Sequence, residues 1–383
     1  MVPSKLVLNL VPYDQQSPVP GLYDPIRMTN KAVAGHLLQM PWDEETGWGS
    51  PTIGKYDNLS LDPSASVLHY ATETFEGMKA YRGFDGKLRL FRPELNAERL
   101  LRSNARVSLP SFDPKAALEL IAAYAAVECP RWLPEPGSHL YIRPAMIGSG
   151  RAIGINKPPE ALFFVFGTLF PQARRLATVY HLLTSQPSQI RAWPGGFGAN
   201  KVGANYGPSI TSHVEAKRRG CNQTLWLFGQ EELVTEAGGS NFFVVMRRQN
   251  SDQLELVTSP LDTGIILDGI TRRSVLDLAR ERAPDLEVVE RPLTMSEIAA
   301  AASEGRLVES FVSGTAVFIS PVASITHGDS VVRFPMTVLE NGEKRPAEKY
   351  STTIRTWLEE IIYGKVDHPW GYIVEENQQL GSS

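Results

Sequence analysis

The chain has 383 residues, of which 42% are hydrophobic and 21% charged, and its formal net charge is −4. These values indicate a soluble globular protein with a sizeable core, and the length suits two domains. The weakly acidic charge and the lack of an apolar run of roughly 18 residues argue against nucleic acid and membrane as partners.

The cysteine and histidine usage excludes two further classes of protein. The only cysteines, Cys129 and Cys221, are too few for a disulfide framework and favour a reducing compartment. The seven histidines lack metal-ligand spacing, so we expect no metal site. The N-terminal apolar stretch is interrupted by Asn9, Pro12 and Asp14, unlike a signal peptide. We expect a cytoplasmic protein, with the mitochondrion left open as the alternative.

The first clear predicted unit is a β-hairpin over residues 78–93. Two alternating runs flank the turn-forming pair Asp85-Gly86. A helix is predicted to follow at about 95–107, with Asn96 as its N-cap.

A second helix should begin at Asp113-Pro114, because Asp caps a helix and Pro fits its first turn. Strands are predicted over 140–148 and 161–167, the second buried on both faces. The pattern then breaks down over 170–189, which we interpret as an interdomain linker.

Strands and helices also mix in the second half of the chain. The sequence predicts strands at 224–229 and 242–246, a helix at 269–281, and a capping box formed by Thr294 and Glu297. A closing helix at 352–364 carries its apolar residues on one face. The chain therefore reads as a two-domain α/β (α+β) enzyme, with a small N-terminal α/β domain at 1–169, the linker at 170–189 and a large domain at 190–383.

Residues 195–209, "GGFGANKVGANYGPS", contain a single charged side chain, Lys201. Small neighbours permit close packing of a planar group over the backbone, and a reachable lysine can act as a nucleophile. Tyr206 could hydrogen-bond an oxygen next to the reacting carbon. Taken alone, an exposed loop lysine is the alternative.

Glu236 in "LVTEAGGSN" follows an apolar run and precedes two glycines. A carboxylate held at a strand end could keep the ring nitrogen of pyridoxal phosphate protonated, as that cofactor requires when it acts as an electron sink. A solvated turn glutamate is the alternative.

Two segments could bind anions. The helix predicted after Gly269 would present the amides of Ile270 and Thr271 to a phosphate, and Arg99 could complete such a site. The turn "SGTA" at 313–316 could offer amides to a carboxylate. A solvated helix arginine and a plain connecting turn are the alternatives, and the chain has neither a full GxGxxG motif nor a P-loop.

Six separated motifs carry a resemblance to a known family. They are "FEGMKAY", "FRPELNAERLLRS", "LYIRP", "RAWPGGFGANKVGANYGPS", "LVTEAGGSN" and "VSGTA". In this order they resemble the branched-chain amino-acid aminotransferases, pyridoxal-phosphate enzymes of fold type IV, in their larger eukaryotic-type form. The match runs from about residue 48 to residue 364.

The resemblance implies a small N-terminal α/β domain, a larger C-terminal pseudo-barrel domain and a homodimer. It implies that pyridoxal 5'-phosphate is bound covalently by Lys201, and that an L-amino acid and a 2-oxo acid, 2-oxoglutarate in one direction, are the substrates. By the same resemblance, the other cofactor-binding residues are Glu236 on the ring nitrogen, Tyr206 on the phenolic oxygen, Arg99, Ile270 and Thr271 on the phosphate, and Thr315. Thr315 and Ala316 would receive the substrate carboxylate, and Tyr70, Phe75, Lys79, Tyr141 and Arg143 would line the substrate cleft.

Three positions depart from the family pattern around the substrate. Gly239 stands in place of a threonine, Val33 in place of an aromatic residue, and Leu169 in place of a tyrosine. We therefore expect a looser side-chain pocket with a flattened substrate preference.

The sequence leaves two alternatives to branched-chain transamination. One is a different fold-type IV activity: a transaminase specialised for a larger or unusual amino acid, a D-selective enzyme, or an aminodeoxychorismate-type lyase. "LYIRP" and "SGTA" disfavour the last two. Another is a cofactor-binding protein without turnover, which the complete set of Lys201, Glu236 and Tyr206 disfavours.

Overall fold

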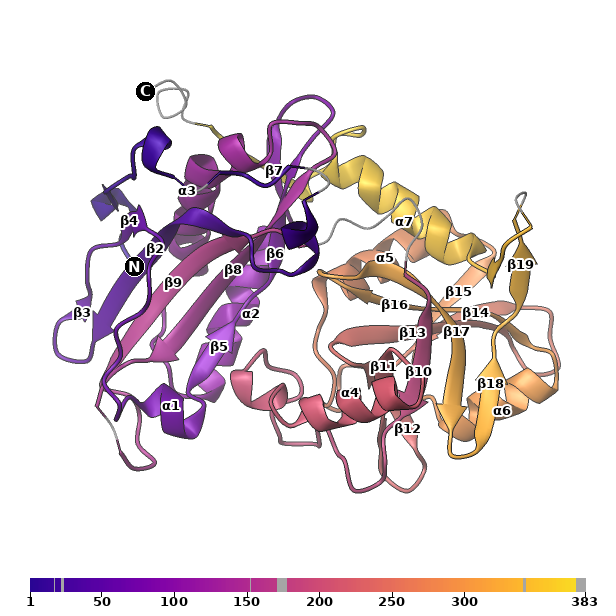
Figure 1. The fold of residues 1–383 in the computed structure, drawn as a ribbon. Helices are drawn as coiled ribbons and strands as arrows, with labels where there is room; N and C mark the ends of the chain where they lie inside the picture. The colour runs from indigo at the N-terminus through magenta and orange to yellow at the C-terminus, as the bar shows by residue number, and fades with distance from the viewer. Residues whose placement is uncertain (17, 22–23, 152, 171–177, 340–341, 377–383) are drawn as a thin grey trace. The chain divides into compact units, whose positions relative to one another are not determined.

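A computed structural model describes residues 1–16, 18–21, 24–151, 153–170, 178–339 and 342–376 (Figure 1). The chain forms two compact units. Unit 1 consists of Met1–Gln172, Asn200–Ala204 and Glu359–Ser383, and unit 2 of Ala173–Ala199 and Asn205–Leu358. Both units mix strands and helices, which confirms the predicted α/β class.

The structure differs from the predicted domain limits at three places: the lysine segment, the C-terminal residues and the predicted linker. The lysine segment Asn200–Ala204 and the C-terminal residues from Glu359 belong to unit 1. Within the predicted linker, Tyr180–Thr184 form strand β10, which pairs with strands on both sides, and 171–177 lie outside the described residues. The short apolar run "HLLT" gave too weak a strand signal to be recognised. The wider division at residues 169 and 190 stays a prediction.

The described part of unit 1 is built on a 10-stranded sheet with the order β1-β4-β2-β9-β8-β6-β7-β21, with β3 beside β2 and β5 beside β8. Its strands are β1 (Val7–Leu8), β2 (Val33–Asp43), β3 (Gly47–Trp48), β4 (Thr52–Lys55), β5 (Glu73–Phe75), β6 (Met78–Arg82), β7 (Leu88–Phe91), β8 (His139–Gly148), β9 (Glu160–Thr168) and β21 (Gly371–Val374). Its helices are α1 (Ser66–Tyr70), α2 (Pro93–Arg106) and α3 (Pro114–Trp132), with short 3-10 turns at Pro3–Lys5, Tyr13–Gln15 and Pro25–Met28.

Local sequence signals explain several of these elements. The predicted hairpin is present as β6 and β7, and Gly86 at its turn has a φ of +80°. The side chain of Asp113 accepts a hydrogen bond from the Lys115 amide at the start of α3, as predicted. The prediction for Asn96 was wrong, because α2 already begins at Pro93 and Asn96 lies buried inside it.

The core of unit 1 lies between its sheet and helix α3, which packs on β2, β8 and β9. Leu140 and Ile142 of β8 and Val165 of β9 point into this core, so their neighbours along each strand point to the other face. The prediction that β9 is buried on both faces was wrong, because Phe164 and Phe166 on that other face are only half-buried.

The C-terminal segment is tied into unit 1. Strand β21 pairs with β7, and Val374 belongs to the core. Two residues later, the Glu376 carboxylate makes a bidentate ion pair with Arg82 on β6, with both nitrogen–oxygen distances at 2.6 Å. Arg82 also donates to the carbonyl of Leu133.

Unit 2 contains, in its described part, a 9-stranded sheet with the order β12-β11-β10-β17-β16-β13-β14-β15. Because β12 also pairs with β13, the strands β12, β11, β10, β17, β16 and β13 close into a ring, which is the pseudo-barrel expected from the motifs. Its strands are β10 (Tyr180–Thr184), β11 (Gln223–Phe228), β12 (Leu233–Ala237), β13 (Ser240–Arg247), β14 (Leu254–Thr258), β15 (Leu286–Glu290), β16 (Leu307–Gly314), β17 (Phe318–His327) and β18 (Ser330–Arg333), and β19 (Met336–Val338) pairs separately with β20 (Lys344–Pro346).

The helices of the second half are α4 (Ser209–Arg218), α5 (Ile270–Arg282), α6 (Met295–Ser303) and α7 (Lys349–Ile362), and Gly203–Asn205 form a 3-10 turn. Helix α6 contributes Met295, Ile298 and Ala301 to a core shared with β13 and β16. The predicted apolar face of the closing helix is present in α7, where Ile354 and Leu358 are buried.

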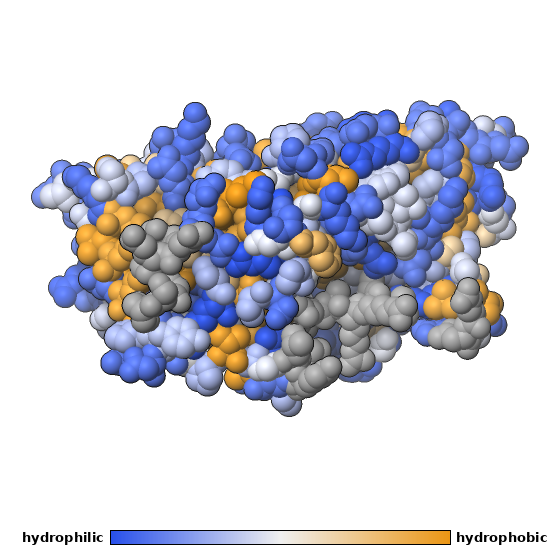
Figure 2. Space-filling model, turned by 90° about the horizontal axis from the view of Figure 1, so that it is seen from above, coloured by the Kyte–Doolittle hydropathy of each residue, from blue (hydrophilic) through white to orange (hydrophobic). Residues whose placement is uncertain are grey.

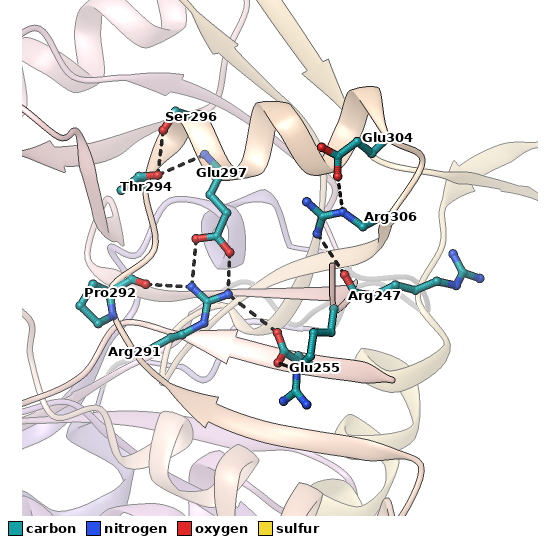
Figure 3. Close-up of polar contacts among 10 residues, drawn as sticks. Arg247, Glu255, Arg291, Pro292, Thr294, Ser296, Glu297, Glu304 and Arg306 are labelled. Carbon is teal, nitrogen blue, oxygen red and sulfur yellow. Dashed lines mark hydrogen bonds and ion pairs between the residues drawn. The ribbon is translucent and has the colours of Figure 1, made fainter. Parts of the chain in front are cut away.

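The predicted capping box at α6 is only half formed (Figure 3). The Glu297 amide donates to the Thr294 hydroxyl at 3.1 Å, as in a capping box. The Glu297 carboxylate, however, is paired with Arg291, whose Nη2 lies 2.6 Å from Oε1. Arg291 also lies 3.8 Å from Glu255, so the charge of Arg291 joins α6 to β14.

Figure 2 shows one face of the molecule, on which hydrophilic residues predominate and hydrophobic residues form separate patches. None of the helices in the described ranges combines the length and apolarity that crossing a bilayer would require.

Glu309 on β16 is a buried carboxyl group at the start of α7. It accepts hydrogen bonds from the amides of Tyr350 at 3.0 Å and Ser351 at 2.7 Å, and its residue is 0% exposed. Burial raises its pKa from an ordinary value of 4.5 to about 7, against the lowering effect of the two amides. Near neutral pH, this helix start is therefore held by a carboxyl group that exchanges a proton.

The Glu309→Gln variant should remove a pH dependence of stability. Since the pKa is higher in the folded chain, the folded state binds more protons between pH 4.5 and about 7, and stability falls as pH rises through this window. Between about pH 5 and pH 8, the free energy of unfolding of the wild type should fall by about 2–3 kcal/mol more than that of Glu309→Gln. Urea unfolding at both pH values measures this, with Glu287→Gln, at an exposed position of β15, as the control. Parallel losses in wild type and Glu309→Gln would contradict it.

Candidate active site

The backbone of Lys201 is fixed on the sheet and helix of unit 1. Its carbonyl accepts from the Phe75 amide at 3.1 Å, and its amide donates to the Ser103 hydroxyl at 2.9 Å. The next residue, Val202, bridges Thr74 on β5. The loop predicted from glycine content is thus held by β5 and α2 on both sides of the lysine.

The Lys201 side chain is half-buried, and its ammonium lies 4.9 Å from the centre of the Phe75 ring. Two residues on, Gly203 packs so closely on the Glu73 carboxylate that a Cβ atom would collide with it. The glycine therefore permits the approach of this segment to β5, which agrees with the expectation of small residues at close backbone contacts.

Four of the predicted substrate residues share one face of the unit 1 sheet. Lys79 on β6 lies directly opposite Tyr141 on β8, and Arg143 lies two residues further along β8 on the same side. The Arg143 guanidinium is 4.7 Å from the Phe75 ring, and its Nη2 is 3.3 Å from the Tyr141 hydroxyl. Desolvation lowers the pKa of buried Lys79 to about 8. This face combines aromatic surface with cationic groups suited to a small organic acid.

The remaining unit 1 residues separate into two groups. Val33 lies opposite Thr168, which puts it on the Tyr141 face of the sheet, beside a cavity of about 320 Å³ lined partly by the N-terminal segment. Tyr70 on α1 is 39% exposed, and its hydroxyl accepts from the Gly154 amide. Leu169, predicted as a pocket wall, is instead buried in the hydrophobic core at 2% exposure, so its replacement of a tyrosine does not widen the pocket.

Arg99 on α2 forms a buried ion pair with Glu76. Its Nε lies 2.7 Å from Oε1 and its Nη2 lies 2.8 Å from Oε2, and Asn96 donates to Oε2 at 2.7 Å. Burial acts to raise the pKa of Glu76, but Arg99, Lys201 and Asn96 together hold it below its usual value. Glu76 escaped sequence reasoning, although it lies in the quoted motif "FEGMKAY". The available signal was a carboxylate beside Gly77, between two runs with strand character.

Glu236 lies on β12 in unit 2 with its side chain 2% exposed. Its Oε2 is 2.7 Å from Arg191 Nη1, and its Oε1 accepts from the Leu267 amide and the Asn241 side chain, both at 3.3 Å. The alternative of a solvated turn glutamate is therefore wrong. Neither Arg191 nor Asn241 could be predicted, because within their motifs they carry no local signal that pairs them with Glu236.

Helix α5 begins immediately after the predicted anion-binding glycine. Gly269 is its N-cap, and no side chain caps the helix, so the amides of Ile270 and Thr271 lie at its positive end. A Cβ atom on Gly269 would collide with the Asn241 amide oxygen. Asn241 also donates to the Leu267 carbonyl at 2.9 Å and thereby links Glu236 to this helix start.

The turn at Thr315 and Ala316 joins β16 to β17. Thr315 is half-buried and Ala316 exposed, and Phe318 at the end of the turn has a φ of +59°. This conformation is unusual for a bulky residue, and such strain is often found at functional sites. Also in unit 2, Tyr206 is half-buried, and a Cβ atom on Gly239 would lie 3.8 Å from its ring. Gly239 thus leaves space beside Tyr206.

The chemistry of these groups fits pyridoxal phosphate. Unit 1 provides a half-buried lysine on a fixed backbone, and unit 2 provides a buried carboxylate, a phenol and an uncapped helix start. These match the aldehyde, the ring nitrogen, the phenolic oxygen and the phosphate of that group in charge and hydrogen-bonding type. Within the described residues, no cluster of three or more His, Cys, Asp or Glu side chains could hold a metal ion.

Sequence comparison finds relatives over most of the chain. The model of the amino-transferase class IV family matches residues 73–325. The chain is 43% identical over 345 residues to the mitochondrial branched-chain-amino-acid aminotransferase of Bos taurus, covering 89% of this chain and 84% of the relative. It is 40% identical over 359 residues to the cytosolic branched-chain-amino-acid aminotransferase of Saccharomyces cerevisiae, covering 90% and 91%.

Solved structures share the fold. The branched-chain aminotransferase of Thermoproteus uzoniensis with norvaline superposes with a TM-score of 0.66 at 25% identity, over 88% of this chain and 100% of that one. The branched-chain amino acid aminotransferase of Thermobaculum terrenum in its PLP-form gives a TM-score of 0.67 at 23% identity, over 90% and 100%.

The Glu76→Gln variant should destabilise the protein strongly. It would leave the buried Arg99 charge without its counter-ion, and such changes cost roughly 3–5 kcal/mol. Because the pKa of Glu76 is lowered, its stabilising effect is present at neutral pH and should fade as pH falls through the carboxyl range. Urea unfolding at neutral and acidic pH measures both effects.

The matched control for Glu76→Gln is Arg248→Gln, which breaks a more exposed ion pair with Glu255 and Glu287. It should leave the unfolding midpoint unchanged. A loss no greater than that of the control would show that the Glu76 pair does not stabilise the fold.

Proposed function

Because this chain belongs to the class IV aminotransferase family, as its motifs predicted, we propose that it catalyses pyridoxal-phosphate-dependent transamination of a branched-chain or other apolar L-amino acid. We propose 2-oxoglutarate as the amino-group acceptor, giving a 2-oxo acid and L-glutamate. The observation that carries this proposal is the identity of 40–43% to branched-chain-amino-acid aminotransferases over about nine-tenths of the chain.

When bound, pyridoxal phosphate supplies an electron sink and carries the amino group between the two substrates. Lys201 binds it covalently, and in its free form the Lys201 amine moves the proton from the Cα atom of the substrate. The fixed backbone of Lys201 supports this role, because a base must be positioned within reach of its proton.

Glu236 holds a proton at the ring nitrogen. Its burial and its place within a strand support this role, since a preorganised charge in a dry site is effective. Tyr206 hydrogen-bonds the phenolic oxygen, and the amides of Ile270 and Thr271 bind the phosphate together with Arg99 and Thr315.

We propose that the protein recognises both the carboxylate and the side chain of the amino-acid substrate. The turn at Thr315 and Ala316 receives the carboxylate and thereby imposes the L configuration. The side chain of the substrate contacts the face that carries Phe75, Lys79, Tyr141 and Arg143, and the neighbouring Tyr70. Gly239 and Val33 are the positions at which the chain has lost bulk relative to the family pattern.

We also propose that the enzyme is a homodimer, with small amino and oxo acids as its other partners. For the compartment we propose the cytoplasm, with the mitochondrion as the alternative. Relatives of both kinds occur, such as the cytosolic enzyme of Rattus norvegicus and the mitochondrial enzyme of Bos taurus. Both cysteines are free and buried, which agrees with a reducing compartment.

The assignment of Lys201 is tested by trapping the cofactor. Borohydride treatment of the yellow holoenzyme should fix a pyridoxyl group on the peptide that contains Lys201, as read by peptide mass spectrometry. Lys201→Ala should lose the label and its turnover, while Lys217→Ala on α4 should keep both. Label on any other lysine would overturn the assignment.

Substrate preference is tested with valine, leucine, methionine and phenylalanine as amino donors. Because the chain lacks bulk at Gly239 and at Val33, kcat/KM should fall gently across this panel, with phenylalanine still measurable. Gly239→Thr should steepen the preference for the branched chains about tenfold, since one methylene is worth about 1–3 kcal/mol in a fitted site. A Cβ atom at this position meets the Tyr206 ring at an ordinary contact distance of 3.8 Å. A steep preference in the wild type, with phenylalanine inactive, would contradict the looser pocket.

A further inference from the structure

Arg191 is a charged residue that the proposed mechanism does not use. It lies in unit 2, and its side chain is 4% exposed. Its Nη1 forms an ion pair with Glu236, 2.7 Å from Oε2, and donates a hydrogen bond to the Ile265 carbonyl at 3.4 Å. The adjacent Ala192 packs with Ile265 and Ile266 in a small apolar cluster, so the base of the arginine is fixed by packing.

The two oxygens of Glu236 have different neighbours. Oε1 accepts from the Leu267 amide and the Asn241 side chain, which are neutral groups at 3.3 Å. Oε2 instead faces a full positive charge, the Arg191 guanidinium. A carboxylate this deeply buried is costly unless it is paired, and without a partner it would take up a proton and become neutral.

The protonation state of Glu236 decides where the ring proton of the cofactor lies. An ionised carboxylate accepts a hydrogen bond from a protonated ring nitrogen, whereas a carboxylic acid keeps its proton, donates a hydrogen bond through it and leaves the nitrogen neutral. Only the protonated ring is a strong electron sink. A cation beside the carboxylate makes it a weaker base, which favours the proton on nitrogen.

We propose that Arg191 is a positioning residue for the proposed transamination, and that it acts through Glu236. It keeps the Glu236 carboxylate ionised, so that the proton shared with the cofactor remains on the ring nitrogen. The inference rests on the proposed function for its cofactor, while the pairing of Arg191 with Glu236 is a property of the protein alone.

The direct test is nitrogen NMR of the full-length holoenzyme loaded with ring-¹⁵N pyridoxal phosphate. The wild type should show a protonated ring nitrogen at neutral pH, and R191Q should shift its resonance towards the neutral form. R191K keeps the charge and should resemble the wild type, as should R248Q, which removes an exposed arginine of the same unit. An R191Q resonance identical to that of the wild type would overturn the proposal.

Turnover supplies a second readout. R191Q should lower kcat about 10- to 100-fold, with little change in KM. Deleting a group that contacts the cofactor directly typically lowers kcat about 100- to 1,000-fold, and an indirect effect should be smaller. R191K should restore most of kcat. Equal losses in R191Q and R191K would show that the side chain acts through its shape and not through its charge.

The apoprotein separates this proposal from the proposed function. In R191Q, the buried Glu236 would lose its cationic neighbour and would take up a proton more readily in the folded state, so stability should fall as pH rises from acidic to neutral values. R191Q/E236Q should lack this fall. The stability of the wild type should likewise show no such fall when it is compared with that of E236Q. The same pH dependence in R191Q and R191Q/E236Q would overturn the role of Arg191. Failure of the wild type to bind pyridoxal phosphate would instead overturn the proposed function, and the apoprotein comparison would still decide the pairing.

Discussion

The attachment of residues 200–202 to β5 and α2 is the constraint on which the reactive lysine depends. Two backbone hydrogen bonds and one bridge fix the main chain, so the only freedom left to Lys201 lies in its side chain. A long flexible amine on a rigid base can reach a planar group, swing aside and return without rebuilding the loop. The glycines around it permit the close backbone approach on which this anchoring depends.

Buried carboxylate–arginine pairs recur in both units. Glu76 with Arg99 in unit 1 and Glu236 with Arg191 in unit 2 have all four side chains at 5% exposure or less. Pairs of this kind contribute little net stability compared with apolar packing, so their retention calls for another reason. Each holds a formal charge at a chosen place in a dry environment, where electrostatic effects are strong. The predicted phosphate and ring-nitrogen ligands are members of these pairs.

Much of the fold could be predicted from local signals, and the failures have physical causes. The β6–β7 hairpin and the Asp113 cap depend on neighbouring residues only, and both were predicted correctly. Asn96 looked like a cap because its side chain suits that role, yet its tertiary contact with Glu76 keeps it inside the helix. Strand β10 is short and gains its hydrogen bonds from β11 and β17, which no local pattern reveals.

The site residues divide in the same way. Lys201 and Glu236 could be selected because each is an isolated charge among small or apolar residues. Arg191 could not be selected, because its role depends on an ion pair with Glu236, which is 45 positions away in the chain (236 minus 191) and is brought near by the fold. Leu169 was expected in the pocket but lies in the core, because a motif resemblance does not say to which side of the sheet a residue points.

The final strand has a consequence for how the protein is made. Strand β21 completes the unit 1 sheet, Val374 enters its core, and Glu376 neutralises Arg82. During synthesis from the N-terminus, unit 1 therefore waits for nearly the whole chain with the edge of β7 open, while every residue of unit 2 has already left the ribosome. Domains usually fold in the order of their synthesis. Here unit 1, whose synthesis begins first, completes its sheet last. Until then the unpaired edge of β7 is a site at which nascent chains can mispair.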